Sequence, residues 1–179
     1  DPGAKGISLL LVETKDAPGY KVGKVLKKIG QKGQDTCELF FEDVRVPAKN
    51  VIGGEIGRGF GQLMTELPYE RLIVALSAVA FTERAIQLTV DYVKERKAFG
   101  KALIEFQNTR FVLADAKTQA TVARTFVDRC IEEQIAGKLD TVTASMAKSW
   151  CTDLQCKVID DCLQLFGGYG YTLDYPIAH

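Results

Sequence analysis

The segment Leu63–Phe81, LMTELPYERLIVALSAVAF, is the strongest indication of a helical fold in this chain. Steps of three and four residues place one set of side chains on a single helical face. That set is Leu63, Leu67, Glu70, Val74, Ser77 and Phe81. The opposite face carries Leu72, Ile73, Leu76 and Val79. A helix that is apolar on both sides is expected to be a central one, packed all round. Pro68 predicts either a kink or a helix that begins near it.

Two further helices are predicted after this segment. The second runs from about Glu105 to Ala136, and Gly137 is its natural stop. Its stripe of mostly small residues, which permit close packing, is Val112, Ala116, Gln119, Ala123, Phe126 and Cys130. The third is capped by Asp140 and ends near Phe166. Its apolar face carries Cys151, Leu154, Val158, Cys162 and Leu165. The sequence therefore predicts three long antiparallel helices.

Residues 1–53 have the pattern of β structure instead. Ile7–Val12, Cys37–Glu42 and Val44–Val46 are short apolar or alternating runs, separated by glycine and proline. A strand that opens at residue 7 has no visible partner upstream, so we expect this β part to be half of a larger domain. The predicted fold is mainly α with a partial β segment, and the predicted domains are residues 1–53 and 54–179.

Composition excludes several classes of function. Lys plus Arg and Asp plus Glu number 23 each in the 179 residues, so no overall field favours nucleic acid or an anionic membrane. Hydrophobic residues make up 46%, enough for a sizeable core. No uninterrupted apolar stretch reaches the roughly 20 residues of a membrane span, so no transmembrane segment is expected. The opening residues 1–3 resemble neither a signal peptide nor a transit peptide.

Five cysteines and one histidine limit the chemistry further. The odd number of cysteines argues against a closed disulfide framework and favours reduced, mostly structural thiols in a reducing compartment. No metal site is expected, because the only histidine is His179. The absence of an internal histidine also disfavours a Ser-His or Cys-His nucleophile. Gly57–Gly61 has the wrong spacing for a dinucleotide fingerprint, and it is interpreted as a hinge.

Glu70 is the strongest candidate for a catalytic group. A carboxylate on the apolar stripe of a central helix loses hydration, which disfavours its charged form. A base that removes a proton from carbon needs such tuning. The alternative is an ion pair, either with an arginine of a neighbouring helix or with Arg71. Glu66, one turn earlier, is the fallback base.

Two other motifs have the chemistry of ligand binding. Arg96 offers a rigid fork of donors suited to pyrophosphate, and Gln107 can both donate to and accept from a nucleotide edge. The alternative for the first is a solvated basic run, Lys94–Lys101. In Gln164–Gly168, two glycines follow a helix and let backbone amides approach a ligand. The alternative there is a plain helix C-cap followed by a turn.

Four motifs of the chain, taken together and in their order, resemble the C-terminal half of the acyl-CoA dehydrogenases. They are Tyr69–Leu72, Arg96–Lys101, Glu105–Gln107 and Gln164–Tyr171. These flavoenzymes desaturate fatty acyl thioesters. The resemblance covers essentially the whole chain and is greatest to the long-chain type, while the isovaleryl type shares the placement of the glutamate. It implies the end of a β-barrel domain followed by an antiparallel, four-helix-type bundle. Both parts are expected to be truncated in this chain.

The resemblance also implies roles for individual residues. Glu70 would take the α-proton of the substrate while a hydride leaves the β-carbon for FAD. Pro68, Tyr69 and Arg71 would lie beside the bound acyl-CoA. The residues implied for FAD binding are Arg96, Phe99, Gln107, Gln164, Leu165, Phe166, Gly167 and Gly168. In the family these loops reach FAD largely across a subunit interface.

The implied partners are an acyl-CoA substrate, electron-transferring flavoprotein and further copies of the chain, with a dimer of dimers expected in the mitochondrial matrix. The isolated polypeptide is expected to have little or no turnover, because much of the flavin-ring pocket should come from other barrel strands. Two alternatives stay open. The chain could be a non-enzymatic helical oligomerisation module, or part of an acyl-CoA oxidase, which passes electrons to oxygen.

Overall fold

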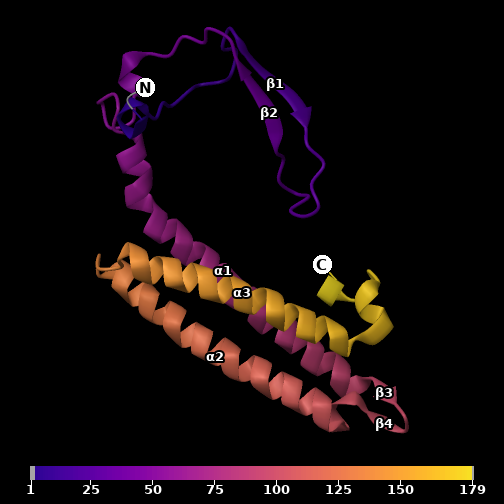
Figure 1. The fold of residues 1–179 in the computed structure, drawn as a ribbon. Coiled ribbons are helices and arrows are strands. Elements are labelled where there is room, and N and C mark those ends of the chain that lie inside the picture. Colours follow the sequence, from indigo (N-terminus) through magenta and orange to yellow (C-terminus); the bar gives the residue numbers. More distant parts are fainter. Residues whose placement is uncertain (1–2, 179) are drawn as a thin grey trace. The chain divides into compact units, whose positions relative to one another are not determined.

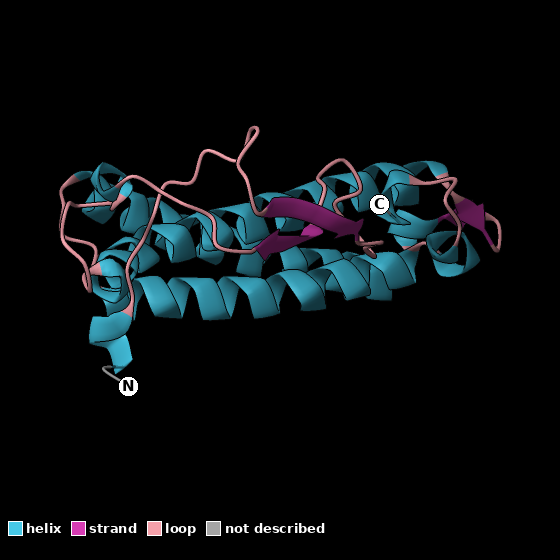
Figure 2. Cartoon of the chain, turned by 90° about the horizontal axis from the view of Figure 1, so that it is seen from above, coloured by secondary structure: helices cyan, strands magenta, loops and turns pink. Residues whose placement is uncertain are grey.

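The computed structural model describes residues 3–178, so His179 lies outside the described residues. The chain divides into two compact units, Asp1–Thr65 and Glu66–His179 (Figure 1). The longest helix, α1 (Gly59–Glu95), crosses the boundary between them. Helices dominate the secondary structure, and the sheets are small (Figure 2). The prediction of a mainly α fold with a partial β segment is confirmed, whereas the division at residues 53 and 54 stays a prediction.

The first unit contains one β-hairpin. Strands β1 (Tyr20–Val25) and β2 (Cys37–Phe41) pair antiparallel from Tyr20↔Phe41 to Val25↔Cys37, with an irregularity after Val22. The predicted strand at Cys37–Glu42 is confirmed, whereas β1 was not predicted. Apolar side chains are exposed on both faces of this hairpin, and a two-stranded sheet of this kind needs further partners to bury them.

The other two predicted strands are wrong. Ile7–Val12 forms no strand, and its one β-bridge joins Leu10 to Val51. Its other backbone bonds reach Ala4, Asn50, Ile52 and the start of α1, where Gly59 N donates to Ile7 O at 2.9 Å. Val44–Val46 forms no strand, because it lies between a turn at Asp43, with φ +50°, and Pro47, which has no N–H for a ladder. Short apolar runs therefore overstate the β content here.

The second unit is a helical bundle of the expected kind. The remainder of α1 packs with α2 (Gln107–Ile135) and α3 (Thr141–Leu165), as Figure 1 shows. Their shared core consists of Leu72, Ala75, Ala78, Val79, Ala85, Ile86, Ala116, Ala120, Ala123, Val127, Cys130, Ala147, Cys151, Leu154, Val158 and Cys162. Small residues dominate this core, so the helices can approach closely. The apolar face predicted for α3 matches this core except for Leu165, which is half-buried. The stripe predicted for α2 is half right: Ala116, Ala123 and Cys130 belong to the core, whereas the other three residues are half-buried.

The connection between α2 and α3 follows its sequence signals. Gly137 adopts φ +66° just after α2, and its N–H donates to Gln134 O at 3.0 Å. Lys138 N donates to Glu133 O at 2.8 Å, which completes a Schellman stop. Asp140 then accepts from the amides of Val142 and Thr143 through Oδ1, at 2.8 and 3.0 Å. The predicted stop and cap are both confirmed.

Helix α1 begins at Gly59, so Pro68 lies inside it. The alternative of a helix that begins near Pro68 is therefore wrong, whereas the kink stays a prediction. The buried face of α1 carries Leu72, Ala75 and Val79, but Val74 and Phe81 are exposed, the latter by 60%. The expectation of a helix packed all round is therefore wrong for this chain, because α2 and α3 cover only one face.

The exposed face of α1 also makes this helix apolar overall. By length and composition alone, α1 could cross a membrane: its best 18-residue window has a mean hydropathy of 1.4 and is 39% buried. The core helix of a bundle meets the same test. The expectation that the chain has no transmembrane segment stays a prediction.

A partly exposed ion pair joins α1 to α2, and three thiols lie in the interior of the bundle. Arg124 Nη2 of α2 lies 2.7 Å from Glu83 Oε2 of α1, and Arg124 Nε donates to Oε1 at 3.1 Å. Cys130, Cys151 and Cys162 are buried, and residues 3–178 contain no disulfide. Burial raises the pKa of Cys151 to about 11, so this thiol stays protonated and unreactive at neutral pH. This matches the structural role predicted for the thiols.

Candidate functional site

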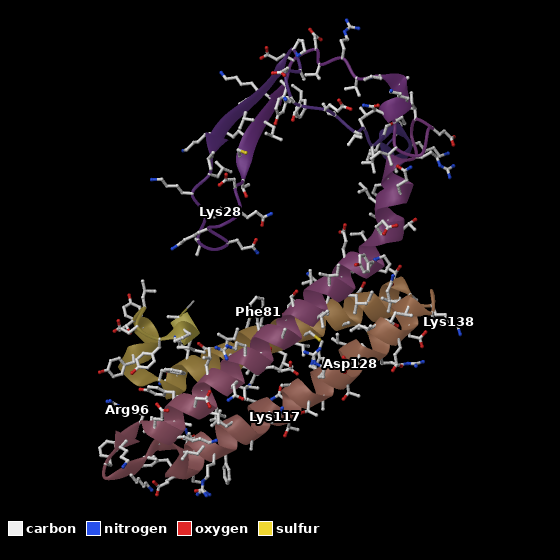
Figure 3. All side chains as sticks on the ribbon, turned by 180° about the vertical axis from the view of Figure 1, so that it is seen from behind. Lys28, Phe81, Arg96, Lys117, Asp128 and Lys138 are labelled. Atoms are coloured by element: carbon white, nitrogen blue, oxygen red, sulfur yellow. The ribbon has the colours of Figure 1, made fainter. Side chains whose placement is uncertain are left out.

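A pocket of about 760 Å³ lies at one end of the bundle. It forms where α1 runs into the hairpin β3 (Lys97–Ala98) and β4 (Lys101–Ala102), and where α3 runs into the 3₁₀ turn η4 (Gly167–Tyr171). Its lining consists of Tyr92, Arg96, Ala98, Phe99, Leu103, Phe106, Asn108, Thr109, Gln164, Leu165, Phe166, Gly167, Gly168, Tyr169 and Thr172. Arg96 is visible at this end of the bundle in Figure 3. Two motifs that are far apart in the sequence therefore meet in one place.

The hairpin that presents the first motif was not predicted. Its two-residue loop, Phe99 and Gly100, has positive φ at both positions, +53° and +83°, as type I′ turns require. Leu103 N donates to Arg96 O at 2.8 Å, and Glu105 Oε1 accepts from Ala102 N at 2.9 Å. These bonds fix the hairpin against the start of α2 and leave Phe99 96% exposed at its tip.

The second motif is a glycine turn after α3. Phe166, 4% exposed, ends the helix, and Gly167 follows with φ +59°. A Cβ added at Gly167 or Gly168 would meet no atom within 4 Å, so both backbone positions border open space. A ligand can therefore approach this backbone closely, as the sequence predicted.

Aromatic rings join the two motifs. The Tyr92 hydroxyl on α1 donates to Phe166 O at 3.3 Å, and the two rings stack with centroids 4.1 Å apart. Burial raises the pKa of Tyr92 against the opposing effect of nearby Arg96, so this hydroxyl remains a donor at neutral pH. The Arg96 guanidinium lies over the Tyr169 ring, with Cζ 5.3 Å from its centroid. The pocket thus combines a cation, apolar rings and accessible backbone.

Most of the residues predicted to bind a cofactor line this pocket. They are Arg96, Phe99, Gln164, Leu165, Phe166, Gly167 and Gly168. Gln107 is the exception: it is the exposed first residue of α2, and its neighbours Phe106 and Asn108 line the pocket instead. Sequence reasoning missed Tyr92, although it lies four residues before Arg96 and so on the same helical face.

The predicted catalytic region lies elsewhere on α1. Glu70 and Tyr69 are exposed, and Pro68 and Arg71 are half-buried. The burial expected for Glu70 is not provided by the described residues. The alternative ion pair is not seen either: within residues 3–178 the Glu70 carboxylate has no salt bridge. The fallback base, Glu66, is also exposed.

Glu70 and the pocket are well separated along the same helix. Arg96 follows Glu70 by 26 positions (96 − 70), which is about 39 Å at the helical rise per residue. Glu70 is not among the residues that line the pocket. The two predicted sites of one chain therefore do not form a single cavity.

Comparison with known proteins identifies the family. The model of the acyl-CoA dehydrogenase C-terminal domain matches residues 57–179. The chain belongs to the acyl-CoA dehydrogenase family. The long-chain specific acyl-CoA dehydrogenase of Sus scrofa mitochondria is 50% identical over 175 residues, covering 98% of this chain and 40% of the pig protein.

Solved structures of the family have the same fold. An acyl-CoA dehydrogenase from Geobacillus kaustophilus superposes with a TM-score of 0.94 at 49% identity, covering 99% of this chain and 47% of that one. Butyryl-CoA dehydrogenase from Megasphaera elsdenii gives a TM-score of 0.91 at 40% identity, with 98% and 45% covered. The chain thus spans less than half the length of these relatives.

The acyl-CoA dehydrogenases use FAD, and the pocket suits part of that cofactor. Arg96 offers a guanidinium to a diphosphate, the backbone at Gly167 and Gly168 is open to a ligand, and Phe99 offers an exposed ring. Tyr92 and Phe166 close the floor behind them. These residues would hold the phosphate and nucleotide portion of FAD.

Proposed function

We propose that this chain is part of an enzyme that dehydrogenates long-chain acyl-CoA thioesters between the α and β carbons. The observation that carries the proposal is the meeting of the Arg96 hairpin and the Gln164–Gly168 turn around one pocket. A pocket built from a cation, accessible glycine backbone and aromatic rings is better suited to bind a dinucleotide than to bind a helix of a partner protein. The similarity to long-chain specific relatives favours a long-chain substrate.

Glu70 is the proposed base for the α-proton. Its carboxylate projects from a face of α1 that also exposes Tyr69, Ile73, Val74 and Phe81. These apolar neighbours offer a surface for an acyl chain, and covering them would remove water from the carboxylate and make it a stronger base. Pro68 and Arg71 would flank the bound thioester. When bound, FAD accepts the hydride from the β-carbon.

The separation within α1 supports an oligomeric enzyme. The distance of about 39 Å between Glu70 and Arg96 exceeds the length of an extended dinucleotide. One FAD held by Arg96 therefore cannot present its flavin ring to Glu70 of the same chain. We propose that the pocket serves the FAD of a neighbouring copy, in a dimer of dimers. The proposed electron acceptor is electron-transferring flavoprotein. The proposed location is the mitochondrial matrix, which the mitochondrial pig relative supports.

The 179-residue polypeptide alone is proposed to have little turnover. Glu70 is exposed in it, so its carboxylate lacks the water-free surroundings that catalysis needs. In water the carboxylate is a weak base toward a carbon acid, and correct placement by itself would give a small rate.

The decisive experiment follows the flavin of the full-length protein. Anaerobic addition of a long-chain acyl-CoA should bleach the visible flavin absorbance, and electron-transferring flavoprotein should restore it. Rapid recovery with oxygen alone would instead favour an acyl-CoA oxidase. A purified full-length protein that neither retains nor binds FAD would refute the enzymatic proposal and leave the oligomerisation module.

A further inference from the structure

We propose that Tyr169 is a positioning residue that holds the guanidinium of Arg96 in the orientation needed for the diphosphate. This inference rests on the proposed function, since it assumes that the pocket receives FAD. Tyr169 belongs to the glycine turn η4, and Arg96 follows the last residue of α1. The guanidinium carbon lies 5.3 Å from the centroid of the Tyr169 ring, within the range of a cation–π interaction.

The ring of Tyr169 is itself held in place. Tyr175 contacts it edge-on, with centroids 5.3 Å apart and planes at 64°. The same Tyr175 ring lies 5.7 Å from Phe166 and 5.2 Å from Tyr92. Tyr175, which is itself held between Phe166 and Tyr92, therefore supports the ring over which Arg96 lies.

The aromatic contacts form a closed circuit with the backbone. Arg96 N donates to Tyr92 O at 2.9 Å in the last turn of α1, and Tyr92 stacks on Phe166, which precedes the glycine turn. From that turn, Tyr169 reaches back to Arg96. The circuit couples the position of the guanidinium to the position of the backbone at Gly167 and Gly168. Both groups are proposed to bind the same cofactor, so this coupling sets their relative placement.

The Arg96 guanidinium keeps donors available. Within residues 3–178, no carboxylate forms a salt bridge with Arg96, so none of its N–H groups is bound to an anion of this chain. A long side chain that is already restrained loses less freedom when it binds a ligand. Tyr169 should therefore strengthen FAD binding without touching the phosphates.

A double-mutant cycle tests this role in the full-length protein. The four proteins are the parent, Tyr169→Leu, Arg96→Gln and the double variant, and the measurement is the dissociation constant of FAD for each apoprotein. Tyr169→Leu should weaken FAD binding by about two- to fivefold, the strength of an exposed cation–π contact. In the Arg96→Gln background the same change should have no further effect, because the guanidinium that it positions is gone.

The conservative variant separates the ring from the hydroxyl. Tyr169→Phe keeps the ring face, so its affinity for FAD should equal that of the parent, and it remains informative even if leucine lowers the melting temperature. An equal loss on Tyr169→Leu in both backgrounds would show a merely structural role and overturn the inference. A loss in the phenylalanine variant as large as in the leucine variant would overturn it too. Unchanged FAD affinity in Arg96→Gln would instead refute the proposal that this pocket binds FAD.

Discussion

Two regions of the helical bundle contribute to the proposed enzyme, and they differ in how complete they are. At the C-terminal end of α1, the hairpin, the glycine turn and five aromatic side chains line a pocket made of residues of this chain alone. Around Glu70, on the same helix, the outward side chains are exposed. A binding loop can therefore be shaped locally, whereas a buried base requires covering elements from elsewhere.

Glu70→Gln is the change expected to have the largest effect. In the full-length protein it should lower turnover of acyl-CoA by about 10²–10⁴-fold, the usual contribution of a general base, because the amide cannot accept the α-proton. Flavin content should remain at the parent level, since Glu70 does not line the pocket. Steady-state kinetics and the flavin absorbance measure the two quantities.

Glu66→Gln is the matched control for that experiment. Glu66 lies one turn earlier on α1 and is also exposed. Its replacement should leave turnover near the parent value. A large loss of turnover in Glu66→Gln, together with normal turnover in Glu70→Gln, would show that Glu66 is the base and Glu70 is not.

Arg96→Gln tests the pocket at the C-terminal end of α1. The variant loses the charge-assisted bonds proposed to the diphosphate, so FAD affinity should fall by about ten- to a hundredfold, corresponding to roughly 1.5–3 kcal/mol. Arg96→Lys should recover only part of that loss, because an ammonium lacks the planar fork. Titration of the apoprotein with FAD measures both.

The opposite effects of these two variants would contradict the proposed division between a cofactor-binding pocket and a separate catalytic face. If Arg96→Gln kept full FAD affinity while Glu70→Gln released the flavin, the cofactor would depend on the exposed face rather than on the pocket. The expected result assigns binding to one end of α1 and proton transfer to the other.

The sequence predicted the bundle well because its helices follow local rules. The periodic stripes on α2 and α3, the stop at Gly137 and the cap at Asp140 need only neighbours in the chain to be recognised. The strands were harder to predict. Ile7–Val12 is as apolar as a strand, yet pairing depends on a partner that the residue pattern does not reveal.

For the candidate site, sequence predicted the motifs but not what joins them. Arg96 and Gly167 were recognised through the resemblance, whereas their meeting depends on the stack of Tyr92 against Phe166, a contact across 74 residues of chain. The exposure of Glu70 was missed for a related reason. An apolar stripe shows that a face should be covered, but not which element covers it.

The smallest expected effect concerns a second glutamate on α1, which does have a partner in this chain. Glu83→Gln removes the bidentate pair with Arg124 and should lower the free energy of unfolding by about 1 kcal/mol, a modest value because both side chains remain partly exposed.

The hydrogen bond from Arg124 holds the pKa of Glu83 below its usual range. A carboxyl whose pKa is lower in the folded state contributes stability above its unfolded pKa and loses it as the pH falls through the folded value. The difference between parent and variant should therefore be full at neutral pH and shrink as the pH falls below about 4.5. Denaturant unfolding at neutral and acidic pH measures it, and a difference that stays constant down to pH 3 or so would show that packing, rather than charge, accounts for the contribution of Glu83.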